Sequence, residues 1–277
     1  MTYRLLAFDL DGTLLGNDLQ IRPASIAAIQ TARELGYKVV MVTGRHHIMA
    51  WPYHHQLNLD TPLLACNGTY AWDFARGEAL FAKPLTKAEA TALLGLIRLH
   101  DVHALLYLRD AQAYETLEPH LTHLLHWAEV LPAEVRPNMV QVADFESLLR
   151  AADLVWKYAV SSVSDGKIEP FIAQVEAELG LACERSGHNR VDVASAGNSK
   201  GALLLEWIAT QGITPAEVVA FGDNYNDLSM LQGVGLGVAM GNAEAPVREQ
   251  AARVIGKNDT DAIADFLRDE IFANAVV

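Results

Sequence analysis

Residues 5–13 read LLAFDLDGT, an apolar run of strand character that leads directly into Asp9 and Asp11. Gly12 and Thr13 then turn the chain away. Burying carboxylates at the end of a strand costs free energy unless the charges have a use. Open α/β sheets bind their ligands at the carboxyl ends of their strands. The stretch therefore predicts a buried strand followed by a functional pair of carboxylates.

Strand-like and helix-like segments alternate on the carboxyl side of this stretch. The first strand is expected over residues 4–10, and helical spacing of apolar residues follows over 23–35. Further β-branched and apolar runs occupy 37–42 and 62–66. This order is typical of a parallel sheet with helical crossovers. Residues 68–81 have the pattern of a hairpin that turns near Gly77.

The middle of the chain has a mixed pattern. Short strands and helices alternate there without the long apolar runs of the first part; the strands are expected over 104–108, 139–142, 156–160 and 181–185, and the helices over 90–99, 118–129, 145–152 and 167–179. We interpret residues 84–187 as an inserted α+β cap domain.

The α/β pattern resumes after Arg190. Strands are expected over 191–193, 218–221, 235–240 and 254–255, and helices over 200–210 and 259–272. The predicted fold class is therefore α/β, with a doubly wound parallel sheet in a catalytic core formed by residues 1–83 and 188–277. The cap lies between these two segments in the sequence.

Composition narrows the function classes. The chain has 277 residues, a formal net charge of −13, 51% hydrophobic and 20% charged residues, which together indicate a globular protein with a substantial core. The negative charge argues against non-specific binding of nucleic acid or of anionic membranes. No apolar run is long enough to span a bilayer, and no secretory signal is evident. With two cysteines read as free thiols, the cytoplasm is the expected location.

Several of the expected strands end in polar groups that would meet at one sheet edge. They are Asp9 with Asp11, the run Thr43-Gly44-Arg45, the pair Asn67-Gly68, and Gly222-Asp223, with Lys200 at a nearby helix start. Carboxylates can hold a hard divalent cation, which offsets the repulsion between a carboxylate nucleophile and a phosphate. A hydroxyl, a backbone amide and a lysine can hold the phosphate oxygens as charge builds. This inventory favours phosphoryl transfer with a carboxylate nucleophile.

Four of these segments resemble the motifs of the haloacid dehalogenase superfamily. Residues 9–13 (DLDGT) are similar to its first motif, 42–45 (VTGR) to its second, 198–201 (NSKG) to its third and 222–227 (GDNYND) to its fourth. Their order, with a long insertion between the second and third, resembles the Cof-type phosphatases. The resemblance extends over the whole chain.

The resemblance implies a Mg²⁺-dependent phosphatase that works through an aspartyl-phosphate. Asp9 would be the nucleophile and Asp11 the acid/base. Metal ligands would be Asp9, Asp223 and the backbone carbonyl of Asp11, with Asp227 behind them. The phosphate would be held by the Leu10 amide and by Thr43, Gly44, Lys200 and Asn226.

The substrate is expected to be a small phosphorylated metabolite such as pyridoxal phosphate or a sugar phosphate, selected by cap residues that the sequence does not identify. Two other functions stay open at this point: a phosphomutase on the same core, and a non-enzymatic regulator that is phosphorylated on Asp9. The sequence does not indicate an oligomeric state.

Several suggestive residues have ordinary explanations that we favour. The histidine pairs 46–47 and 54–55 and the series 120, 123 and 126 do not have the spacing of a closed zinc site, so packed or solvated histidines are expected. For His46 and His47, a contact with the substrate stays open as an alternative. Asn67-Gly68 is interpreted as a turn at the start of the hinge towards the cap, Cys66 as a small buried thiol, and Arg45 as an ion-pair former.

Overall fold

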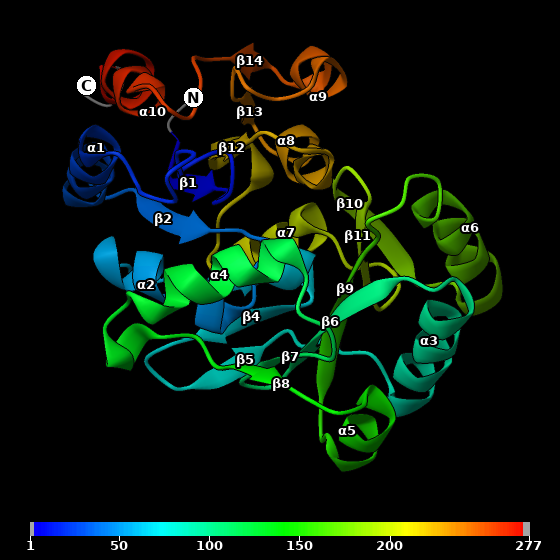
Figure 1. Ribbon diagram of the computed structural model, residues 1–277. Helices are drawn as coiled ribbons and strands as arrows, with labels where there is room; N and C mark the ends of the chain where they lie inside the picture. Colours follow the sequence, from blue (N-terminus) through cyan, green and yellow to red (C-terminus); the bar gives the residue numbers. More distant parts are fainter. Residues whose placement is uncertain (1–2, 274–277) are drawn as a thin grey trace. The chain divides into compact units, whose positions relative to one another are not determined.

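The computed structural model describes residues 3–273, and these divide into two units (Figure 1). The first unit consists of the chain up to Gly44, the segment Tyr53–Phe81 and the chain from Ser199 onward. The second consists of Arg45–Pro52 and Ala82–Asn198. Each unit has its own sheets and its own hydrophobic core.

The first unit is built on a five-stranded parallel sheet with the order β14-β13-β12-β1-β2. Strand β1 lies inside this sheet, between β12 and the edge strand β2, with Ala7 opposite Ala220 and Val40. All four residues of β1 are buried, as expected for a parallel sheet that is covered on both faces. The strands are β1 (Leu5–Phe8), β2 (Lys38–Met41), β12 (Val218–Gly222), β13 (Leu236–Ala239) and β14 (Arg253–Val254).

Helices cover both faces of this sheet. Successive residues of a strand point to opposite faces, so the apolar strands need a helical layer on each side. Leu5 and Ala7 belong to a core that includes α7 and α8. On the other face Phe8 stacks on Phe221 with ring centroids 4.6 Å apart, and Phe221 meets Phe266 of α10 edge-on. The helices are α1 (Pro23–Glu34), α7 (Lys200–Thr210), α8 (Leu228–Gly233), α9 (Ala245–Gln250) and α10 (Ala262–Phe266). The doubly wound α/β fold is therefore confirmed.

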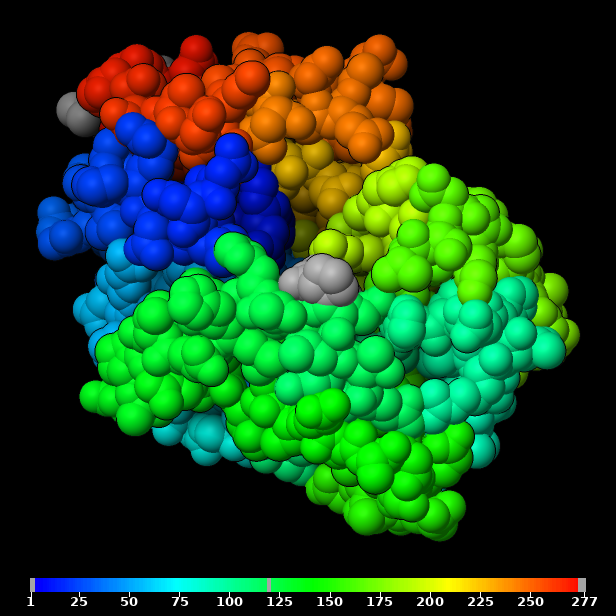
Figure 2. Space-filling model, viewed as in Figure 1, coloured from blue at the N-terminus to red at the C-terminus, as the bar shows by residue number. Residues whose placement is uncertain are grey.

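The expected C-terminal helix is shorter and less regular than predicted. It begins at Ala262 and continues beyond Phe266 as a wider helical segment, Leu267–Phe272. This end of the first unit packs against α1, and Figure 2 shows the red C-terminal surface directly beside the blue N-terminal one.

A three-stranded antiparallel sheet of β3 (Leu63–Ala65), β4 (Tyr70–Asp73) and β5 (Glu78–Leu80) completes the first unit. The expected hairpin is β4–β5, and its turn contains Gly77 at φ +67°. β3 also bridges the end of β2, because the Thr43 N–H donates to the Leu64 carbonyl at 2.8 Å. Helix α2 (His47–Gln56), with Pro52 inside it, belongs partly to each unit.

The second unit has a six-stranded sheet with the order β10-β11-β9-β6-β7-β8. It is antiparallel except for the pair β7–β8. Its core lies between this sheet and helices α3, α5 and α6, and includes Tyr158 and Phe171. The strands are β6 (His103–Leu108), β7 (Gln112–Tyr114), β8 (Met139–Gln141), β9 (Val155–Ser161), β10 (Ala182–Gly187) and β11 (Arg190–Ala194); the helices are α3 (Lys87–Leu99), α4 (Pro119–Glu129), α5 (Phe145–Ala151) and α6 (Ile168–Leu179).

The boundaries of the units differ from the expected ones. We expected the core to resume at residue 188, but β11 pairs with β9 and β10 and so belongs to the second unit, which ends at Asn198. The segment Arg45–Pro52 also groups with the second unit. One contact that links this segment to the second unit is the hydrogen bond that His46 Nε2 donates to the carbonyl of Leu108, in β6, at 2.7 Å.

Within residues 3–273, no helix combines the length and the apolar character that crossing a bilayer requires. Neither Cys66 nor Cys183 is part of a disulfide in the described part of the chain; Cys66 is buried and Cys183 is partly exposed.

Candidate active site

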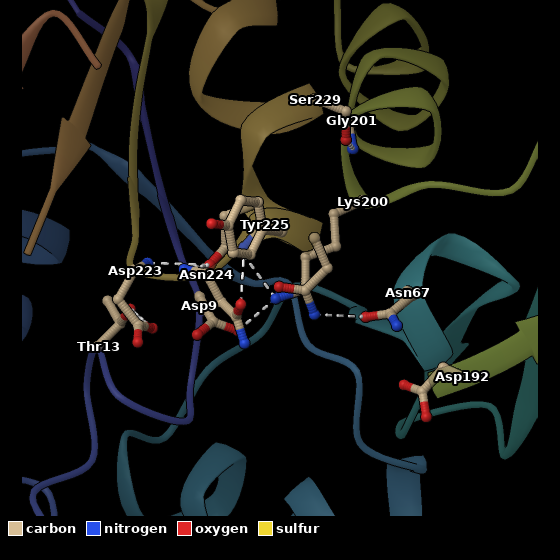
Figure 3. Close-up of polar contacts among 12 residues, drawn as sticks. Asp9, Thr13, Asn67, Asp192, Lys200, Gly201, Asp223, Asn224, Tyr225 and Ser229 are labelled. Carbon is tan, nitrogen blue, oxygen red and sulfur yellow. Dashed lines mark hydrogen bonds and ion pairs between the residues drawn. The ribbon is translucent and has the colours of Figure 1, made fainter. Parts of the chain in front are cut away.

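Lys200 links the ends of two strands of the parallel sheet. Its Nζ lies 2.6 Å from Asp9 Oδ1 and 2.6 Å from Asp227 Oδ1, and all three side chains are at most 5% exposed. Figure 3 shows Lys200 extending from the start of α7 towards Asp9. Ser199 caps this helix by accepting the Ala202 N–H at 3.1 Å. The cap fixes where α7 begins and therefore where the lysine projects.

Asp227 is held from two sides. While one carboxylate oxygen meets Lys200, the other accepts the backbone N–H groups of Asp223 and Asn224 at 2.9 and 3.0 Å. Asp223 follows β12, and its Oδ1 accepts the Thr13 hydroxyl at 3.0 Å. Each carboxylate of this cluster therefore has a fixed position before any ligand binds.

Gly12 leaves room for this arrangement. It has φ +79°, which favours glycine, and a Cβ at this position would collide with the Asp223 carboxylate. The turn that follows Asp9 and Asp11 must therefore contain a glycine to bring β1 and β12 together at this point.

The electrostatics of the cluster reflect an excess of negative charge. Burial raises the pKa of Asp9 well above its usual range, the charge of Asp227 adds to this, and Lys200 offsets only part of it. Burial and then Asp227 raise the pKa of Asp223 to about 7. Burial works against the charged form of Lys200, but Asp227 and Asp9 outweigh it and raise the lysine pKa.

This carboxylate cluster fits a divalent cation. Asp9, Asp223 and Asp227 each offer an oxygen, and these oxygens all lie within 4.8 Å of one another. Hard cations such as Mg²⁺ prefer oxygen ligands. Two positive charges would also remove the repulsion that raises the carboxylate pKa values. The donor set and the charge balance therefore both suit Mg²⁺.

The side chains that lie together differ in one respect from the expected ligand set. Asp227, expected behind the metal, belongs to the same group as Asp9 and Asp223, whose oxygens all lie within 4.8 Å of one another. The Asp11 side chain is exposed and lies outside this group, although its charge contributes to the raised pKa of Asp223. The ligand expected from Asp11 is its backbone carbonyl, and the acid/base role of its side chain stays a prediction.

The expected phosphate-binding residues follow neighbouring strands of the first unit. Leu10 follows Asp9 directly after β1, and Thr43 and Gly44 follow β2. Asn226 lies in the turn before α8, and its Nδ2 donates to Asn67 Oδ1 at 3.1 Å. Asn67 is buried and contacts Asn226, which agrees with its place among the polar strand ends rather than with the hinge turn that we favoured from the sequence.

Asn242 is a contact that the sequence analysis did not identify, and Asn67 was listed there among the polar strand ends but interpreted as a turn. Asn242 Nδ2 donates to the Gly12 carbonyl at 2.9 Å and lies 3.4 Å from Asp223 Oδ2. Both asparagines follow strands, β3 and β13, as the motif residues do. The position of a polar residue just after a buried strand is the signal that grouped Asn67 with the other strand ends, and it could also have identified Asn242.

The described histidines of the pairs and the series are either packed or exposed: His55, His123 and His126 are exposed, and the side chain of His120 lies outside the described part of the chain. His46, His47 and His54 are buried, and among the described residues the one group able to offer three metal-binding side chains is the aspartate cluster. His46 Nδ1 accepts the Ile48 N–H at 3.2 Å while Nε2 donates to the Leu108 carbonyl, a pattern that requires the neutral ring. Burial accordingly lowers the pKa of His46 to about 4.

This neutral histidine should make stability depend on pH. Its pKa is about 4 in the folded protein against 6.5 in the unfolded chain, so the unfolded state binds the proton first as the pH falls below about 6.5. The free energy of unfolding should therefore decrease between pH 6.5 and 4. In His46→Gln this slope should be shallower by up to about 1.4 kcal/mol per pH unit. Urea unfolding at pH 7, 6 and 5 measures it, and equal slopes would contradict the assignment.

The chain is similar to known proteins over nearly its whole length. The family model for haloacid dehalogenase-like hydrolases matches residues 6–267. The chain is 45% identical to the pyridoxal phosphate phosphatase YbhA of Escherichia coli, over 96% of the chain and 98% of that protein. It is 30% identical to the HMP-PP phosphatase of Serratia proteamaculans, over 96% and 94%.

The fold is also found among solved structures. A haloacid dehalogenase-like hydrolase from B. subtilis has a TM-score of 0.85 with 24% sequence identity, over 96% of this chain and 99% of that one. At this identity the likeness shows a shared fold. The motif order, the fold and the match over nearly the whole chain lead to one conclusion. The protein belongs to the haloacid dehalogenase-like hydrolases, and within this family it is a phosphatase.

Proposed function

We propose that the protein is a Mg²⁺-dependent phosphomonoesterase that forms an aspartyl-phosphate on Asp9 and hydrolyses a small phosphorylated metabolite. Pyridoxal phosphate is the first candidate, because the 45% identical relative carries that name and is matched over nearly its full length. The observation that carries the mechanism is the buried carboxylate of Asp9 at the end of β1, held 2.6 Å from Lys200 and beside Asp223 and Asp227.

Asp9 and Asp223, with the backbone carbonyl of Asp11, would hold the Mg²⁺. Asp227 would keep this arrangement in place, since it accepts the Asp223 N–H at 2.9 Å. When bound, the cation supplies positive charge that lets a carboxylate approach an anionic phosphate.

In the first half-reaction an Asp9 oxygen attacks phosphorus, and the bond from phosphorus to the ester oxygen breaks. Asp11 gives its proton to that oxygen, so the dephosphorylated alcohol leaves neutral. The exposed position of the Asp11 side chain allows it to reach a leaving group outside the buried cluster.

In the second half-reaction Asp11 takes a proton from water, and the water oxygen attacks phosphorus. The bond from phosphorus to Asp9 breaks, which releases phosphate and restores both carboxyl groups. Lys200, Thr43, the Leu10 and Gly44 amides and Asn226 would stabilise the phosphate oxygens through both steps.

The second unit is the part of the chain to which we assign substrate selection, as the cap predicted for residues 84–187. The two cysteines, which form no disulfide in the described part of the chain, are consistent with the reducing cytoplasm, where we expect the enzyme to act. A panel of pyridoxal phosphate, sugar phosphates and nucleotides, assayed for phosphate release with Mg²⁺, tests the substrate. The highest kcat/KM is expected for pyridoxal phosphate, and a better sugar phosphate would change the substrate but keep the mechanism.

Removal of the metal should stop the reaction. After chelation and desalting, turnover should fall below about 1% of the rate with Mg²⁺ and return when Mg²⁺ is added. Without the cation, the negative carboxylate cluster repels the negative substrate phosphate. Mg²⁺ should also raise the melting temperature, and Asp223→Asn should abolish most of this rise. Full turnover in thoroughly chelated protein would refute the metal requirement.

A further inference from the structure

The turn Cys66–Gly68 of the first unit has an unusual backbone. Cys66, Asn67 and Gly68 have φ values of 51°, 54° and 86°, so three successive residues are left-handed. For residues other than glycine this conformation is strained and persists only where the surroundings fix it. Strain of this kind is concentrated at functional sites.

This turn contacts three of the segments assigned above to phosphate binding. The Asn67 N–H donates to the Thr43 carbonyl at 3.1 Å, and Asn67 Oδ1 accepts Asn226 Nδ2 at 3.1 Å. Gly68 packs on the backbone of Ser199, where a Cβ would collide with the Ser199 carbonyl. The second, third and fourth motif segments therefore all meet residues 66–68 (Figure 3 shows Asn67 with its dashed bond).

Gly44 leaves space for the Asn67 carboxamide. A Cβ at position 44 would lie 2.8 Å from Asn67 Oδ1, which is closer than carbon and oxygen approach without a shift. Position 44 lies outside the left-handed region, so its backbone conformation does not itself require glycine. The space taken by Asn67 is the reason that a side chain does not fit there.

The contact with Asn67 also determines how the Asn226 carboxamide is oriented. An NH₂ group carries two hydrogens, so one can bond to Asn67 while the other is left for a phosphate oxygen. Asn226 Oδ1 is buried without a hydrogen-bond partner in the described part of the chain, so the bond to Asn67 is what distinguishes the two amide orientations. The reversed amide would direct an oxygen at the anion.

We propose that Asn67 is a positioning residue for phosphate binding: through its carboxamide it orients Asn226 so that an N–H faces the phosphate. The inference rests on the proposed function, since it takes Asn226 as a phosphate contact. It goes beyond that function by giving a role to a residue outside the four motifs.

Asn67→Gly tests the proposal, because glycine keeps the left-handed backbone and removes only the side chain. The expected result with pyridoxal phosphate is a decrease in kcat/KM of about 10- to 100-fold, as misplacement of a binding group causes. The inhibition constant of inorganic phosphate should rise by a similar factor. Asn58→Gly is the matched control, because Asn58 is an exposed, left-handed asparagine of the same unit (φ 49°) and should leave both constants unchanged.

A double-mutant cycle separates positioning from a general structural role. If Asn67 acts through Asn226, Asn67→Gly should add almost no further loss to Asn226→Ala. Fully additive losses, or an Asn67→Gly enzyme within twofold of the parent, would overturn the proposal. If Asn67→Gly does not fold, Gly44→Ala, which displaces the carboxamide, replaces it in the same cycle with the same expectation.

The assay also distinguishes this inference from the proposed function. Asp9→Asn is measured alongside: if it is inactive while Asn67→Gly is unaffected, the mechanism stands and the positioning role fails. If Asp9→Asn is fully active, the proposed function fails as well.

Discussion

Asp9→Asn should reduce turnover by roughly 10⁴-fold or more, the scale of loss when an enzymatic nucleophile is removed. The substitution keeps the shape of the side chain and its place at the end of β1. It removes one of three clustered carboxylates, and the raised pKa of Asp9 indicates that its charge is costly there. The melting temperature of the metal-free protein should therefore stay the same or rise while activity is lost.

Asp60→Asn is the control for this experiment. Asp60 lies in the same unit, its side chain is 84% exposed, and it has a single ion pair to Arg33 at 3.5 Å. Its replacement should leave both kcat and melting temperature unchanged. An Asp9→Asn enzyme with more than a few per cent of the parental rate, measured on protein free of parental enzyme, would refute Asp9 as the nucleophile.

Lys200→Met should have the largest effect on stability. The substitution keeps much of the side-chain volume but leaves the buried carboxylates of Asp9 and Asp227 without their ammonium partner. Removing one partner of a buried ion pair costs about 3–5 kcal/mol. We expect a loss of this order in the free energy of unfolding of chelated protein, measured by urea denaturation, together with loss of turnover.

The matched variant Lys200→Met/Asp227→Asn tests the cause of that loss. It removes one of the two carboxylate charges that Lys200→Met leaves without a partner. Asparagine can still accept the N–H groups of Asp223 and Asn224 through its carbonyl oxygen. The double variant should regain part of the lost stability but none of the activity. If it is less stable than Lys200→Met alone, packing rather than charge explains the effect.

Local patterns predicted much of the first unit, because its strands are buried on both faces and therefore form continuous apolar runs. Asp9 and Asp223 were identifiable because each directly follows such a run. Lys200 was identifiable only by its motif, since nothing in its neighbours distinguishes a buried lysine from an exposed one at a helix start.

The boundary of the second unit could not be read from the sequence, because it depends on strand pairing. Residues 190–194 alternate apolar and polar side chains as any half-buried strand does. Their place is set by partners far along the chain: Asp192 forms an ion pair with the buried Lys157 at 2.6 Å. Asn67 was undervalued for a similar reason, since its importance comes from Asn226, which lies far away in the sequence.

The pairing of β1 with β12 has a consequence for the synthesis of this protein. Leu5 lies opposite Val218, so on the order of 200 further residues must be synthesised after β1 before its neighbour β12 exists. At a translation rate of about 5–20 residues per second this takes roughly 10–40 s. By then Ala82–Asn198 has been made in full and, with its own sheet and core, can fold first. The catalytic sheet closes late, and until then the apolar edge of β1 is a site for aggregation that the cell must protect.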